Sequence, residues 1–67
     1  MDMNMLKPHQ IRARLLEQGI LVNDVAREMK VRPVTVSSVI TKKGKSKRIQ
    51  KYIAEKIGES FEYVWGD

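Results

Sequence analysis

Apolar residues recur along this chain with the period of an α-helix, and no stretch alternates with the period of two that marks a β-strand. Helix start and stop signals divide the pattern into segments. The first expected helix begins near Pro8 and is closed by Gly19. The others run over about Val22–Met29, Pro33–Thr41, Lys47–Ile57 and Phe61–Trp65. The sequence therefore predicts an all-α fold, a small bundle of four helices followed by a short C-terminal turn.

The expected helix ends carry residues whose chemistry suits them. Proline fits the first helical turn, glycine adopts the left-handed conformation that ends a helix, and a serine hydroxyl can cap the first turn. Residues of these three kinds stand at Pro8, Pro33, Gly19, Gly58, Ser46 and Ser60. Each boundary thus has a local cause.

One core is expected, in a single domain over residues 7–67 that follows a flexible tail over residues 1–6. The inward positions of the helices predict its members, which are Ile11, Leu15, Leu16, Val22, Val25, Ala26, Met29, Val36, Val39, Ile40, Ile49, Ile53, Ala54 and Ile57. Phe61, Tyr63 and Trp65 either close this core or form a self-association patch. The second reading would suit a symmetric homodimer.

The charge of the chain is strongly one-sided. Between Glu28 and Glu55 there are eight basic residues and no acidic one. The whole chain has a net charge of +5, so the residues outside this stretch sum to −3. A concentrated positive surface is typical of proteins that bind nucleic acids, because Lys and Arg displace the counterions condensed on phosphates. A solvated basic face is the alternative reading of this stretch.

The second and third expected helices are joined by only three residues, Lys30 to Arg32. A small residue, Ala26, stands where two steeply crossed helices would touch, and Val31 can plug the turn. Val36 and Val39 would anchor the later helix. This spacing is typical of the DNA-binding helix-turn-helix, whose second helix enters the major groove.

The segment Val25-Ala26-Arg27-Glu28-Met29-Lys30-Val31-Arg32-Pro33-Val34-Thr35-Val36-Ser37 resembles the lambda-repressor-like helix-turn-helix signature, and residues 8–65 resemble the Ner-type phage regulators within it. The resemblance implies a small sequence-specific transcriptional regulator, a phage or prophage repressor that binds operator DNA in the bacterial cytoplasm, associated with the nucleoid. Two positions depart from the family pattern. Lys30 stands where the family usually has Gly, and Arg32 stands where it usually has a Ser cap.

The resemblance and the helical periodicity together give a candidate DNA-binding set. Residues expected to face base edges are Arg32, Pro33, Val34, Ser37, Ser38 and Thr41, while Thr35 either meets a thymine methyl group or serves packing or phosphate contact. Residues expected to hold phosphates are Lys42, Lys43, Lys45, Lys47 and Arg48. Few of these side chains read bases directly, so we expect an AT-rich preference with a contribution from DNA shape.

Other functions fit the sequence less well. With one His, no Cys and no phosphate-cradling glycine loop, no catalytic residues, metal, cofactor or small-molecule ligand are expected, and the chain is not expected to be an enzyme. No apolar run is long enough for a membrane span. A protein-interaction module of the anti-repressor type on the same scaffold is the main alternative, and RNA binding is a third.

Overall fold

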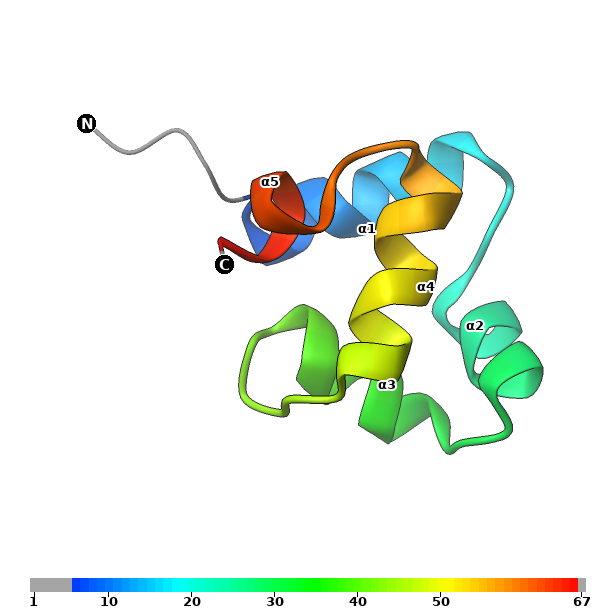
Figure 1. Cartoon of the computed structure of the whole chain (residues 1–67). Coiled ribbons are helices and arrows are strands. Elements are labelled where there is room, and N and C mark those ends of the chain that lie inside the picture. The colour runs from blue at the N-terminus through cyan, green and yellow to red at the C-terminus, as the bar shows by residue number, and fades with distance from the viewer. Residues whose placement is uncertain (1–5, 67) are drawn as a thin grey trace.

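The computed structural model describes residues 6–66, and this part of the chain is helical without any strand (Figure 1). Its helices are α1 (Pro8–Glu17), α2 (Val22–Met29), α3 (Pro33–Ile40), α4 (Lys47–Ile57) and α5 (Phe61–Trp65). The predicted all-α class is therefore confirmed. Helix α3 ends one residue before the expected Thr41, which serves as its C-cap.

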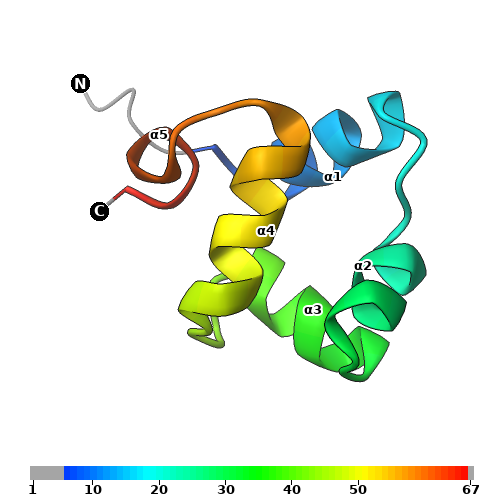
Figure 2. The ribbon, with the colours of Figure 1, turned by 45° about the vertical axis from the view of Figure 1, so that its right-hand side comes forward.

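Helix α4 is the central element of the fold. It packs against α1, α3 and α5, while α2 packs mainly against α3. In two views turned by 45°, α4 runs from its start beside α3 to its end beside α1 (Figures 1 and 2). The pair α2 and α3 is thereby held at one end of the molecule.

The predicted caps are formed. The Ser46 hydroxyl accepts a hydrogen bond from the Ile49 amide at 3.5 Å, and the Ser60 hydroxyl accepts one from the Tyr63 amide at 3.1 Å. Gly58 ends α4 with φ +73°, in the left-handed region that a residue with a Cβ enters only at a cost. The two serine hydrogen bonds satisfy amides in the first turn of a helix, which have no acceptor within that helix.

Two further helix N-termini are capped by side chains that were not among the predicted caps. The Gln10 side chain accepts from the Lys7 amide at 2.7 Å, and the Asp24 carboxylate accepts from the Leu21 amide at 2.9 Å. Both lie three residues beyond the residue whose amide they satisfy. The acidic or amide side chain in the first turn was the signal for each.

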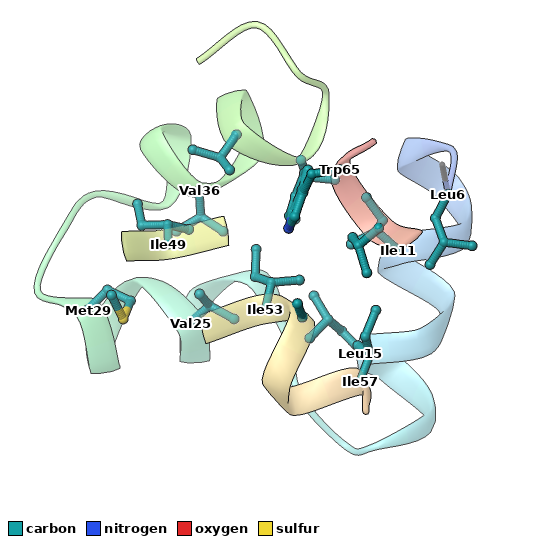
Figure 3. Close-up of a cluster of buried hydrophobic side chains, with 14 of the residues drawn as sticks. Leu6, Ile11, Leu15, Val25, Met29, Val36, Ile49, Ile53, Ile57 and Trp65 are labelled. Atoms are coloured by element: carbon teal, nitrogen blue, oxygen red, sulfur yellow. The ribbon is translucent and has the colours of Figure 1, made fainter. Parts of the chain in front are cut away.

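The core is built from all five helices and from Leu6 (Figure 3). Its buried members are Leu6, Ile11, Leu15, Val25, Ala26, Met29, Val36, Val39, Ile40, Ile49, Ile53, Ala54, Ile57, Val64 and Trp65. Twelve of the fourteen predicted core positions are among them. Val22 is only partly buried against this cluster.

The prediction for Leu16 is wrong. Its side chain is 61% exposed, because Ile11 and Leu15 occupy the side of α1 that enters the core, where α3 and α4 pack. Leu16 is turned by about 100° from Leu15 around the helix axis. The sequence could not show that no element covers this side.

The expected tail is also too long by one residue. Leu6 is only 5% exposed, and its amide donates to the Val64 carbonyl oxygen at 3.3 Å. The chain thus enters the fold before Pro8, beside α5. The rest of the predicted tail, residues 1–5, lies outside the described residues.

The single tryptophan belongs to the core. Trp65 is 7% exposed, and its indole N–H donates to the Gln50 carbonyl oxygen at 2.9 Å. Phe61 and Tyr63 are partly buried against the same cluster. Closure of the core is therefore confirmed for Trp65, while Phe61 and Tyr63 only border it. No helix in the described part of the chain is long and apolar enough to cross a membrane.

Candidate nucleic-acid interface

The turn between α2 and α3 is tight and well connected. Lys30 has φ +60° and ψ +44°, and the Val31 amide donates to the Ala26 carbonyl oxygen at 3.0 Å. Arg32 then returns to an extended conformation, and Pro33 opens α3. The close approach needs a small residue at the helix contact, and Ala26 is almost completely buried there.

Lys30 and Arg32, on either side of Val31 in this turn, are both exposed. Lys30 is exposed although its left-handed backbone costs a residue with a Cβ about 1 kcal/mol. Arg32 is exposed and its side chain caps no amide of α3. Pro33 compensates in part, because its fixed φ is already that of a helix.

Helix α3 has a buried side and an accessible side. Val36, Val39 and Ile40 are completely or almost completely buried. The accessible side, called here the α3 face, consists of Pro33, Val34, Ser37, Ser38 and Thr41. Pro33 and Val34 are exposed, Val34 by 64%, and the other three are half-buried. Five of the six residues expected to meet base edges therefore share one side of α3 and its C-cap, Arg32 precedes the helix as its N-cap, and Thr35 is half-buried beside them.

The loop after α3 folds back on the end of that helix. The amides of Lys43 and Gly44 both donate to the Ser38 carbonyl oxygen, at 2.9 and 3.0 Å, and the Thr41 hydroxyl donates to it at 3.2 Å. A Cβ at Gly44 would lie 3.3 Å from the Ser38 Cβ, so glycine permits this close approach. Ser38 thus marks the edge of the α3 face.

Six exposed cationic side chains stand in the segments that precede and follow α3 along the chain. The group called here the basic rim consists of Lys30, Arg32, Lys43, Lys45, Lys47 and Arg48, all exposed. The Lys47 ammonium lies 5.8 Å from the centroid of the Phe61 ring. Arg48 donates a hydrogen bond to the Met29 carbonyl oxygen at 2.8 Å, so its guanidinium also has a structural task.

Lys42 differs from its neighbours in the loop. Its ammonium donates to the carbonyl oxygens of Leu6 at 2.9 Å and Val64 at 3.4 Å, and lies 5.8 Å from the Trp65 ring centroid. Partial burial lowers the pKa of this ammonium. The side chain points to the two ends of the fold, whereas phosphate contact was expected. We therefore leave Lys42 out of the basic rim.

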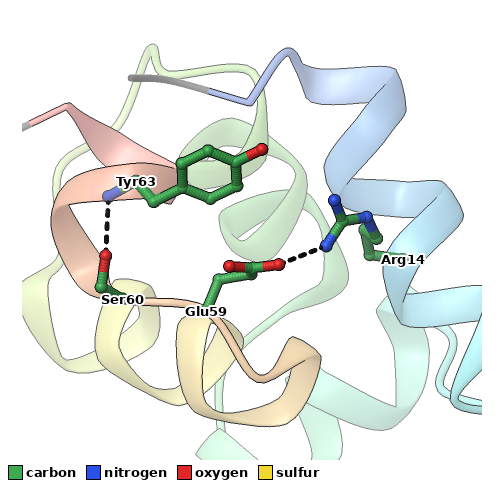
Figure 4. Close-up of polar contacts among 4 residues, drawn as sticks. All are labelled: Arg14, Glu59, Ser60 and Tyr63. Atoms are coloured by element: carbon green, nitrogen blue, oxygen red, sulfur yellow. Dashed lines mark hydrogen bonds and ion pairs between the residues drawn. The ribbon is translucent and has the colours of Figure 1, made fainter. Parts of the chain in front are cut away.

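Two carboxylates of the described chain form ion pairs, both with arginines outside the basic rim. Glu59 pairs with Arg14 at 2.8 Å, beside the Tyr63 ring, and this contact raises the pKa of the guanidinium (Figure 4). Asp24 pairs with Arg27 within α2 at 3.2 Å. Within residues 6–66, no carboxylate forms an ion pair with the basic rim. Glu62 lines the same surface hollow as Lys47 but is not ion-paired with it.

The described residues contain no cluster of three His, Cys, Asp or Glu side chains able to hold a metal ion. The candidate interface offers hydroxyl groups, small apolar surfaces and cations. In comparisons with protein-family models, curated proteins and solved structures, none was found to match this chain.

Proposed function

We propose that this protein binds double-stranded DNA sequence-specifically and regulates transcription, with α2 and α3 acting as a helix-turn-helix. The observation that carries the proposal is the α3 face, an accessible helix side, together with six exposed cations in the segments next to α3 that form no ion pair with a described carboxylate. An α-helix fits the major groove of B-form DNA, and flanking cations can then reach the phosphates on both sides.

The chemistry of the α3 face suits modest direct reading of bases. Val34 offers methyl groups that can meet thymine methyls, and the Ser37 hydroxyl can bond to several base edges. Arg32 has the guanidinium that could make a bidentate contact to guanine. An AT-rich site with one guanine contact, supported by DNA shape, follows from this composition.

The basic rim would supply most of the affinity. Lys43 and Lys45 lie in the loop between α3 and α4, and Lys47 and Arg48 are the first two residues of α4. If these four neutralise phosphates, the slope of log affinity against log salt is about −3.6. Lys30 and Arg32 would add to this attraction from the other end of α3.

The proposed role in a particular kind of cell rests on the resemblance of residues 8–65 to the Ner-type phage regulators. It supports a repressor encoded by a phage or prophage, acting on operator DNA in the bacterial cytoplasm. A homodimer would match a palindromic operator, with half-sites about one helical turn apart. These are parts of the same proposal.

The deciding experiment is selection of bound sequences from a random duplex pool at two salt concentrations. We expect a shared AT-rich motif and an affinity that falls steeply with salt. Failure to retain any duplex at low salt would reject DNA binding and favour the protein-interaction module. Retention without a shared motif would leave only nonspecific binding.

A matched pair of variants locates the interface. Val34→Glu places a negative charge on the α3 face, whereas Leu16→Glu places one on a side chain of similar exposure on α1, at 64% and 61%. We expect Val34→Glu to abolish specific binding, because the carboxylate would face the groove and its phosphates. Leu16→Glu should have little effect. Equal losses in both variants would place the interface elsewhere.

A further inference from the structure

Lys42 stands where α3 gives way to the basic loop. It follows the C-cap Thr41 and has φ +68°, in the left-handed region. Its amide donates to the Val39 carbonyl oxygen at 3.0 Å. The backbone of Lys42 therefore closes α3 and sets the direction in which the loop leaves.

The side chain of Lys42 joins three parts of the molecule. Its ammonium donates to the Leu6 carbonyl oxygen at the start of the fold and to the Val64 carbonyl oxygen in α5. The same Val64 oxygen accepts from the Leu6 amide at 3.3 Å, and the Trp65 ring lies 5.8 Å away. Backbone carbonyls and an aromatic ring are groups that stabilise a partly buried ammonium.

The anchored residue directly precedes two cations of the basic rim. Lys43 is its neighbour, and Lys45 follows across Gly44, whose amide shares the Ser38 carbonyl oxygen with that of Lys43. The loop is thus fixed at Ser38 by its backbone and at Leu6 and Val64 by the Lys42 side chain. A loop held at two places presents its exposed lysines in a narrow set of orientations, which favours simultaneous phosphate contacts.

We propose that Lys42 is a positioning residue, whose ammonium holds the loop bearing Lys43 and Lys45 against Leu6 and α5 and does not itself contact phosphate. The inference rests on the proposed DNA binding for its functional consequence. Its structural content, the linkage of the chain start and α5 to the loop, stands independently of DNA. A disturbance near Leu6 would then reach the phosphate contacts through Lys42.

Amide hydrogen exchange on the free protein tests the linkage. In Lys42→Met, which keeps the aliphatic stem and removes the ammonium, the amides of Leu6, Lys43 and Gly44 should exchange about five- to tenfold faster. Lys42→Arg should restore most of the protection. Lys51→Met, which removes an exposed cation from α4, is the control and should leave these amides unchanged. Unchanged exchange in Lys42→Met would overturn the proposal.

A double-mutant cycle on duplex DNA tests positioning. Lys42→Met should weaken binding about fivefold in the natural sequence, but much less when Lys43→Gln and Lys45→Gln are already present. When Lys42→Met is added to the Lys43→Gln, Lys45→Gln protein, the slope of log affinity against log salt should not change. The same fractional loss in both backgrounds, or a slope smaller by about 0.9, would make Lys42 a phosphate contact and overturn the assignment.

The two proposals fail separately. If no duplex is bound by the unsubstituted protein, the proposed function falls, while the exchange measurement still decides the linkage. If DNA is bound and the cycle shows no coupling, only the positioning role falls. Lys42→Gly is the second variant for both measurements, because glycine adopts φ +68° without strain and preserves the turn.

Discussion

The guanidinium of Arg48 donates a hydrogen bond of 2.8 Å to the backbone carbonyl oxygen of Met29. Met29 is the last residue of α2 and Arg48 is the second residue of α4. The carbonyls at a helix C-terminus lack partners within the helix and carry partial negative charge, so a cation stabilises them. This contact joins the α2–α3 pair to the central helix.

Arg48→Gln should lower the free energy of unfolding by about 1 kcal/mol, a modest loss because Arg48 is exposed and water can replace part of the contact. Urea denaturation followed by the Trp65 fluorescence gives the value, since this indole is buried in the folded state. Lys51→Gln removes an exposed cation from the same helix and should leave the midpoint unchanged. Equal midpoints for all three proteins would show that the Arg48–Met29 bond contributes nothing.

At Lys30 the backbone conformation lowers the stability of the fold, while the side chain adds positive charge to the basic rim. Its φ of +60° favours glycine, so Lys30→Gly should raise the free energy of unfolding by up to about 1 kcal/mol. Lys30→Ala retains the Cβ and should bring no such gain. Both substitutions remove one cation from the basic rim, and both should weaken DNA binding to a similar extent. If the alanine variant were stabilised as much as the glycine variant, backbone strain would not be the cause.

Asp24 gives the protein a dependence on acid. The Leu21 amide donates to this carboxylate at 2.9 Å, and Arg27 donates to it at 3.2 Å. The amide bond first, and then Arg27, hold the pKa of Asp24 below its ordinary 3.8. The contribution to stability is therefore present at neutral pH, above the pKa of the unfolded chain, and is lost as the pH falls through the lower folded pKa.

Asp24→Asn keeps an oxygen acceptor for the Leu21 amide but does not titrate. We expect its unfolding free energy to fall less between pH 5 and pH 2 than that of the unsubstituted protein, as measured by urea denaturation at about six pH values in this range. Glu28→Gln, on the same helix, serves as the control for removing a carboxylate. If the stability of Asp24→Asn falls as much in acid as that of the unsubstituted protein, groups other than Asp24 cause the acid dependence.

The helices could be predicted from the sequence because their ends depend on local chemistry. The hydroxyl of Ser46 caps the amide of Ile49, three residues away, and Gly58 adopts the left-handed conformation that stops α4. Such interactions need no knowledge of distant elements. The buried stripe of α4 follows equally from its period. These are the parts of the fold in which prediction and structure agree.

The errors concern contacts between distant parts of the chain. Leu16 and Leu15 are equally apolar, and only the positions of α3 and α4 decide that Leu15 is buried and Leu16 exposed. Leu6 is buried because the chain start meets α5, a contact between residues 58 positions apart in the sequence (Leu6 and Val64). Neither outcome has a signal in the local pattern.

The candidate site shows the same division. The accessible side of α3 was predictable, because Val36, Val39 and Ile40 mark the opposite side by their spacing. Lys42 and Lys43 look alike in the sequence, yet one ammonium turns to Leu6 and the other side chain is exposed. Their difference depends on the left-handed backbone of Lys42 and on where Leu6 and Val64 lie.

Reading of bases and attraction to phosphates should separate in two variants. Arg32→Ala removes the guanidinium beside the α3 face, and we expect a loss of about 1–3 kcal/mol at the selected site with relaxed preference at one base pair. Joint replacement of Lys43 and Lys45 by Ala should instead weaken binding to all duplexes alike and reduce the salt slope by about 1.8. Fluorescence anisotropy on the selected site and on a scrambled duplex, at several salt concentrations, measures both effects. Equal losses on both duplexes for Arg32→Ala would make Arg32 a phosphate contact, and specificity would then have to come from Val34, Ser37 and the shape of the DNA.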